Sequence, residues 1–185
     1  GVFSGSLSYV FNTFSLEDKS FSSVIYKAGS LGLTEPDARE DLSGNDVARK
    51  LLILARELDL NVEFQNVKIE SLVPKQLNGK TTLKQFKARL KELDAPFEAL
   101  KLKLPKGSVL RYVGELDVEN KTLEVKLISE ENTSTLGQLK GSGSIFEIFT
   151  DSYGDEPLMI QGAGAGKEVT ARGLLSDIIK VSNKL

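Results

Sequence analysis

The residues best suited to chemistry lie in residues 32–50, which read Gly-Leu-Thr-Glu-Pro-Asp-Ala-Arg-Glu-Asp-Leu-Ser-Gly-Asn-Asp-Val-Ala-Arg-Lys. Asp46 and Lys50 are four positions apart, and therefore one turn apart if this segment is helical. An exposed pair at this spacing is usually a plain ion pair that contributes about 0.2–0.5 kcal/mol. The alternative is a lysine held at a cleft by a carboxylate, where it passes a proton to or from a substrate oxygen. The spacing leaves both interpretations open.

Two further carboxylates in this run, Glu35 and Asp41, add to the polar cluster. Each alone is typical of a turn or of a helix start. Together with Asp46 they form a set that suits the ammonium group of a small substrate. We expect Asp37 and Glu40 to be solvated.

Two glycine-containing segments could receive a ligand through the backbone. Residues 162–168 read Gly-Ala-Gly-Ala-Gly-Lys-Glu, which matches neither a phosphate-binding P-loop nor the dinucleotide fingerprint in spacing. A bare glycine backbone before a helix still lets a flat or anionic group approach, although a tight strand-to-helix turn explains it equally well. Near the amino terminus, free N–H groups at Gly5 and Ser6 suit a carboxylate, whereas simple helix capping is favoured on that segment alone.

Composition narrows the possible functions. The 185 residues include no Cys and no His, which excludes disulfides, thiolate nucleophiles, Ser-His triads and most transition-metal sites. Net charge is −2 without a basic stripe, so we expect no nucleic-acid partner. No apolar run approaches the roughly 18–20 residues that span a bilayer, so we expect no membrane association. The lack of Cys fits a reducing compartment, and we expect a cytoplasmic protein.

The pattern of hydrophobic residues predicts helices first, then strands, then a closing helix. Helices are expected at residues 3–14, 20–30, 44–58, 81–93, 95–104 and 167–185, and strands at 66–71, 109–116, 123–128, 144–150 and 156–161. In the helix at 44–58 we expect Val47, Leu51, Leu54 and Leu58 to form the buried face, with Asp46 and Lys50 along its border. Because regular βαβ alternation is absent, we predict an α+β fold with a mostly antiparallel sheet covered by helices, in a single domain over residues 1–185.

Taken together, these segments resemble homoserine dehydrogenase, and the fungal, monofunctional form most closely. The resemblance rests on the 32–50 run, on the opening Phe-Ser-Gly-Ser-Leu-Ser-Tyr, and on the closing Gln-Gly-Ala-Gly-Ala-Gly-Lys-Glu-Val-Thr-Ala-Arg-Gly-Leu-Leu-Ser-Asp. It implies an oxidoreductase that interconverts L-aspartate 4-semialdehyde and L-homoserine with NAD or NADP, in threonine and methionine biosynthesis.

The resemblance also implies roles for individual residues. Lys50 would be the proton donor or acceptor at the substrate oxygen, and Asp46 would orient it. Substrate-binding residues would be Glu35, Asp41, Gly5 and Ser6. Residues against the cofactor would be Gly164, Ala165 and Gly166.

The family binds its dinucleotide on an amino-terminal Rossmann domain that this sequence lacks. Its monovalent-cation site also belongs to that part, so the resemblance implies no metal site in this chain. We therefore expect the catalytic and dimerisation domain of a longer protein, inactive alone, that forms a homodimer through the 108–128 hairpin. The alternatives are a non-catalytic, dimeric amino-acid-binding or regulatory module and a purely structural interaction domain. They differ in whether Asp46 and Lys50 lie near the 162–166 loop.

Overall fold

A computed structural model of the chain describes residues 1–79, 81–164 and 166–184. Its α-helices are α1 (Gly5–Leu16), α2 (Phe21–Ser30), α3 (Arg39–Leu42), α4 (Asn45–Glu57), α5 (Leu83–Arg89), α6 (Asp94–Leu102) and α7 (Lys167–Ser182). Its strands are β1 (Val67–Ile69), β2 (Ser108–Asp117), β3 (Thr122–Glu131), β4 (Ser144–Ile148) and β5 (Leu158–Gly162). Short 3-10 turns cover η1 (Phe64–Asn66), η2 (Lys75–Leu77) and η3 (Leu90–Leu93).

Two small sheets are joined by the amino-terminal segment. In the first sheet β3 lies in the centre, antiparallel to β2 and parallel to β1. In the second sheet β4 and β5 are antiparallel. Gly1 accepts a hydrogen bond from the Gly114 amide of β2, and Val2 forms an antiparallel bridge with Ile145 of β4. The segment therefore lies between β2 and β4 and fixes the two sheets relative to each other.

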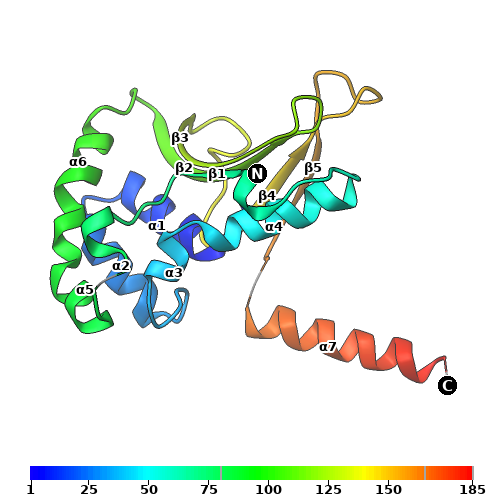
Figure 1. Cartoon of the computed structure of the whole chain (residues 1–185), viewed down its shortest axis with the longest axis horizontal. Helices are drawn as coiled ribbons and strands as arrows, with labels where there is room; N and C mark the ends of the chain where they lie inside the picture. The colour runs from blue at the N-terminus through cyan, green and yellow to red at the C-terminus, as the bar shows by residue number, and fades with distance from the viewer. Residues whose placement is uncertain (80, 165, 185) are drawn as a thin grey trace.

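Helices α1 and α4 cover one face of the three-stranded sheet, as Figure 1 shows. Side chains alternate along β2, so Leu110 and Tyr112 point into this main core together with Phe11 and Leu51. The opposite face is covered by the loop between β3 and β4. There a second, smaller core contains Val2, Val113, Leu136, Leu139 and Ile145.

The helical end of the molecule is organised by aromatic rings. Helices α2, α5 and α6 lie at the end away from α7 (Figure 1). Phe11 and Phe14 of α1 pack against Phe21 and Phe97, and the rings of Phe21 and Phe97 are stacked with centroids 3.6 Å apart. Burying large rings from three helices supplies much of the apolar area that holds this end together.

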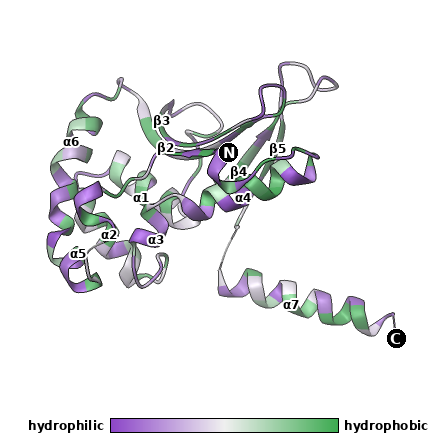
Figure 2. Cartoon of the chain, viewed as in Figure 1, coloured by the Kyte–Doolittle hydropathy of each residue, from purple (hydrophilic) through white to green (hydrophobic). Residues whose placement is uncertain are grey.

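Helix α7 extends away from the rest of the molecule and has no buried residues among those described (Figure 1). Figure 2 shows apolar residues along it, and the exposed ones are Val169, Leu174, Leu175, Ile178, Ile179 and Val181. In the described part of the chain, no helix has the length and hydropathy needed to cross a membrane.

The predicted α+β class and the predicted antiparallel hairpin are confirmed, with β1 as the one parallel strand in the described sheets. The predicted buried face of α4 is wrong in part. Leu54 and Leu58 are 43% and 53% exposed, because the helix packs on the sheet through Ala48 and Ala55 and their neighbours. The buried stripe of α4 runs through Ala48, Leu52 and Ala55 beside Leu51, so Leu54 and Leu58 fall on the solvent side of it.

Gly44 generates a stability prediction because it is the residue from which α4 begins. It adopts φ +77°, and a Cβ there would collide with the Tyr112 hydroxyl. We expect Gly44→Ala to lower the free energy of unfolding by about 2–4 kcal/mol, from left-handed strain plus overpacking. Gly32→Ala is the control, since Gly32 has φ +70° and nothing within 4 Å of its Cβ position. Urea denaturation that gives equal losses for the two variants would contradict the steric argument.

Candidate active site

The start of α1 is a polar, buried corner. Ser4 is the N-cap, and its hydroxyl accepts a hydrogen bond from the Leu7 amide at 3.3 Å. The hydroxyls of Ser4 and Ser6 are 2.9 Å apart and hydrogen-bonded, and each residue is only 8% exposed. Ser4 has an extended backbone, as is usual for an N-cap, and the helix begins at the next residue.

Asp41 ties this corner to the turn that precedes α3. The Ser6 hydroxyl donates to Asp41 Oδ1 at 2.6 Å, and the Glu35 amide donates to Asp41 Oδ2 at 2.9 Å. The side chain of Glu35 is exposed, while its backbone is held by this contact. Three predicted substrate-binding residues are thus joined by two hydrogen bonds through one carboxylate.

Lys50 reaches the same corner from α4. Its Nζ lies 2.8 Å from Asp46 Oδ2 and donates to the Phe3 carbonyl at 3.2 Å. Both side chains remain about half exposed, at 47% for Lys50 and 50% for Asp46. Lys50 therefore contacts the backbone of Phe3, one residue before Ser4, and Asp46 contacts Lys50. The charged ends of both side chains are open to solvent.

The loop that precedes β4 closes the corner beside Gly5. The Gly141 carbonyl accepts hydrogen bonds from Ser8 Oγ at 3.2 Å and from Asn12 Nδ2 at 2.9 Å. A Cβ at Gly5 would lie 3.0 Å from the Ser142 carbonyl oxygen. Glycine at this position therefore lets the backbones of α1 and the loop come into close contact.

The terminal glycine turn lies against the same loop. A Cβ at Gly164 would lie 2.7 Å from Ser144 Oγ, and Ser144 begins β4 two residues after Ser142. Gly166 caps α7 with φ +131°, a conformation that favours glycine, and nothing lies within 4 Å of its Cβ position. Ala165, the third predicted cofactor residue, lies outside the described residues. The predicted substrate and cofactor segments are thus linked through residues 142–144.

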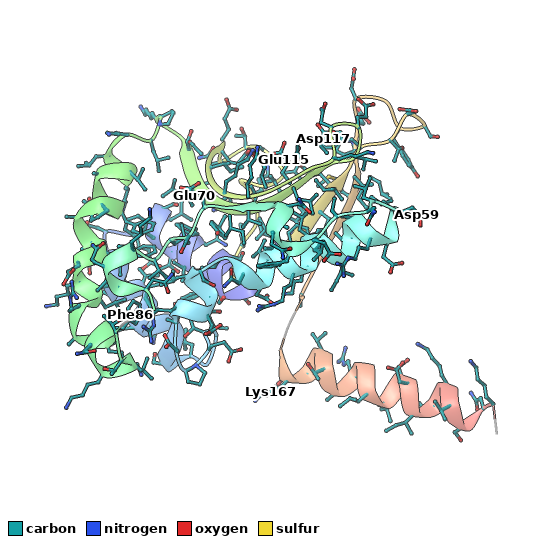
Figure 3. The ribbon with its side chains drawn as sticks, viewed as in Figure 1. Asp59, Glu70, Phe86, Glu115, Asp117 and Lys167 are labelled. Atoms are coloured by element: carbon teal, nitrogen blue, oxygen red, sulfur yellow. The ribbon has the colours of Figure 1, made fainter. Side chains whose placement is uncertain are left out.

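Two surface grooves lie away from this corner. One of about 510 Å³ follows the apolar side of α7 and includes Leu174 and Ile178. The other, of about 240 Å³, lies between α6 and the sheet beside Glu70, which Figure 3 labels. Across residues 1–79, 81–164 and 166–184, no group of three or more Asp or Glu side chains is arranged to hold a metal ion.

Arg39 anchors the turn at residues 37–42. Asp37 was expected to be solvated, but Arg39 Nε donates to its Oδ1 at 2.9 Å, and this hydrogen bond lowers the pKa of Asp37. Arg39 Nη1 also donates to the Thr81 carbonyl at 2.8 Å, and the guanidinium lies over the Phe86 ring, which Figure 3 labels. The Asp-x-Arg spacing is the only sequence signal for this anchor, and it occurs in many exposed turns.

Comparison with known proteins identifies a family for nearly the whole chain. The family model described as homoserine dehydrogenase matches residues 1–179. A homoserine dehydrogenase from Paracoccidioides brasiliensis is 44% identical over 100% of this chain and 52% of its own length. A chloroplastic bifunctional aspartokinase/homoserine dehydrogenase 2 from Arabidopsis thaliana is also 44% identical, over 100% of this chain and 20% of its own. The chain therefore spans about half the length of the fungal relative.

Among solved structures, a protein of unknown function from Candida auris superimposes with a TM-score of 0.86 and 44% sequence identity. The match covers 97% of this chain and 51% of the other. The fold is thus shared over nearly all of the residues compared.

The Asp37–Arg39 pair generates a pH-dependent stability prediction. Because folding lowers the pKa of Asp37 from its ordinary value of 3.8, the pair stabilises the fold fully above that pH, and this stabilisation is lost as pH falls through the lower pKa of the folded state. We expect Asp37→Asn to cost about 1 kcal/mol at pH 7, since the pair is partly exposed, and progressively less as pH falls below 3.8. Glu40→Gln, an exposed carboxylate in α3, is the control. Denaturation curves with the same Asp37→Asn deficit at every pH would refute the pairing argument.

Proposed function

This chain belongs to the homoserine dehydrogenase family, and from that premise we propose that it is the catalytic domain of a cytoplasmic enzyme that interconverts L-aspartate 4-semialdehyde and L-homoserine. The reaction would use NAD or NADP and serve threonine and methionine biosynthesis. The observation that carries the proposal is that Lys50 binds the Phe3 carbonyl while Asp41 binds Ser6, so that both side chains reach the start of α1. Polar side chains from three separate helices therefore gather around a nearly buried pair of serines, with Lys50 at the solvent edge.

We propose Lys50 as the proton donor and acceptor at the substrate oxygen. An ammonium carries three N–H donors, and Asp46 and the Phe3 carbonyl take two of them. The third can then point to a substrate oxygen that gains negative charge when the aldehyde is reduced. In the oxidative direction Lys50 takes the proton from the alcohol. This chemistry needs no covalent intermediate, which suits a sequence without Cys or His.

The substrate's two charged groups have separate partners in this proposal. The Glu35 and Asp41 carboxylates would bind the ammonium group, and Asp41 retains free lone pairs beside its two hydrogen bonds. The carboxylate would face the N–H groups of Gly5 and Ser6. Those groups belong to the first helical turn and have no acceptor among the described residues, whereas Leu7 donates to Ser4.

The glycine turn suits one side of a nicotinamide dinucleotide. Gly164 and Gly166 present bare backbone just before the α7 amino terminus, where a flat or anionic group can approach closely. We propose that this turn, with Ala165, contacts the cofactor, and that its main binding surface and the monovalent-cation site lie outside this chain. When bound, NAD(P) supplies or accepts the hydride.

We further propose that the domain forms a homodimer through its sheet, with the β2–β3 hairpin as the pairing element. The neighbouring two-stranded sheet exposes apolar side chains that a second chain would cover. These are Ile148, Leu158 and Ile160, which are 40–51% exposed. Contiguous apolar residues on a sheet usually mark a protein interface.

One observation favours the non-catalytic alternative of an amino-acid-binding module. The Lys50–Asp46 pair is half exposed, as an ordinary helix ion pair would be. In such a module the acidic residues would bind an ammonium group, and Lys50 would have no role in turnover. Kinetics of Lys50 variants therefore separate the two functions.

The division of labour between domains gives a direct prediction. We expect the 185-residue chain alone to bind NADP weakly and to show no homoserine oxidation, because we place the main cofactor surface elsewhere. The same chain produced together with a nucleotide-binding domain should be active. Absorbance at 340 nm measures the NADPH that each sample forms, and light scattering should find two chains per particle in each sample. Turnover by the chain alone would contradict this division.

The role of Lys50 gives a second prediction. In the complete enzyme, Lys50→Met should lower kcat by about 100-fold or more, the usual contribution of a positioned acid or base, with KM within about threefold. Arg49→Met is the matched control, since it removes a cation from the adjacent, exposed position of α4, and it should change kcat less than about twofold. If kcat of Lys50→Met falls no further than kcat of Arg49→Met, Lys50 has no part in the chemical step, and the binding-module alternative is favoured.

A further inference from the structure

Arg111 is the largest charged side chain buried in the described structure, and it lies outside the corner described above. It is on β2, 1% exposed, and faces the sheet surface opposite α1 and α4. Its guanidinium donates to backbone carbonyls of the loop between β3 and β4. The contacts are to Leu136 at 2.8 Å, Gly137 at 2.7 Å and Leu139 at 3.2 Å, with Leu110 of its own strand at 2.8 Å.

The choice of arginine here is not explained by stability alone. A guanidinium stays charged even though burial lowers the pKa of Arg111, and Glu130 opposes that shift only through space. An apolar side chain of similar volume would cover the sheet face without the cost of burying a charge. A planar fork of donors, by contrast, fixes the orientation of several carbonyls at once.

The carbonyls that Arg111 fixes belong to the segment that reaches the start of α1. Beyond Leu139 the chain continues to Gly141, whose carbonyl receives Ser8 and Asn12, and to Ser142, which abuts Gly5. The segment has little freedom to adjust, since a Cβ at Gly137 would collide with the Glu131 carbonyl. Its position beside Gly5 is therefore set from one end by Arg111 and from the other by α1.

We propose that Arg111 is a positioning residue of the substrate site: through residues 136–142 it fixes the loop that packs against Gly5 at the start of α1. This inference rests on the proposed function and deepens it, because it assigns a buried residue on the far side of the sheet to the binding of homoserine. Displacing the loop would alter the backbone donors that receive the substrate carboxylate, without touching Lys50.

The test uses two variants of the complete enzyme. Arg111→Lys keeps the charge and loses the planar fork of donors. Ser8→Ala removes one of the two hydrogen bonds that hold the Gly141 carbonyl from the α1 side. Kinetics are measured at a temperature where circular dichroism shows full folding. KM for homoserine should rise about 10-fold in Arg111→Lys and about threefold in Ser8→Ala, and kcat should stay within about threefold in both. Hydrogen–deuterium exchange of residues 136–144 should be faster in both.

Leu90→Ala is the control for general loss of stability, because Leu90 is 2% exposed at the helical end. It should lower Tm while KM and exchange at residues 136–144 stay unchanged. An unchanged KM in folded Arg111→Lys, or an equal rise in Leu90→Ala, overturns the inference and leaves the proposed function intact. Absence of homoserine oxidation in the unmodified complete enzyme overturns the proposed function, and this inference with it.

Discussion

The pairing of residues 1–2 between the two sheets is the constraint on which the candidate site depends. Gly1 accepts from the Gly114 amide at 3.0 Å, and Val2 exchanges hydrogen bonds of 2.8 and 3.3 Å with Ile145. Because residues 1–2 are hydrogen-bonded to β2 on one side and to β4 on the other, the chain leaves the sheets at Phe3. The Phe3 ring fills the space beside Gly114, where a Cβ would collide with it. The start of α1 is therefore fixed in position, and the Phe3 carbonyl is presented to Lys50.

The site combines a rigid backbone with open side chains. Ser4 and Ser6 are nearly buried, and no buried side-chain polar atom in the described residues lacks a hydrogen-bond partner. A fully satisfied polar network has one preferred arrangement, so the donors at the start of α1 are oriented before any ligand binds. Lys50 and Asp46 lie at the solvent edge of this network, where a substrate can reach them.

Sequence patterns predicted the elements well and their contacts less well. The helices at α1, α2 and α4 and the β2–β3 hairpin follow from local periodicity and capping, for example Ser4 at the α1 N-cap. The exposure of Leu54 depends on which side of α4 meets the sheet, and this is set by tertiary packing and not by the sequence of one helix. No local sequence pattern marked Arg111 as a buried residue that binds a loop, because the loop carbonyls that it binds are 25–28 residues away. Ser6 and Asp41 were both predicted to bind the substrate, but their hydrogen bond was not predicted, since a contact across 35 residues leaves no local sequence pattern.

The exposure of Lys50 bears on how the proposed enzyme would work. The Lys50 side chain is 47% exposed, so water competes with the substrate for its N–H groups. A half-hydrated ammonium also stabilises developing charge less than a desolvated one does. Hydride transfer at the same corner also requires the glycine turn and the substrate to be brought together in a water-poor space. The apolar side chains of α7, such as Leu174 and Ile178, lie just beyond that turn and are uncovered. Under the proposed function, a nucleotide-binding domain that packs on α7 would cover this apolar surface and lie next to the glycine turn from which α7 begins. The free energy of burying the helix would then help to assemble the site.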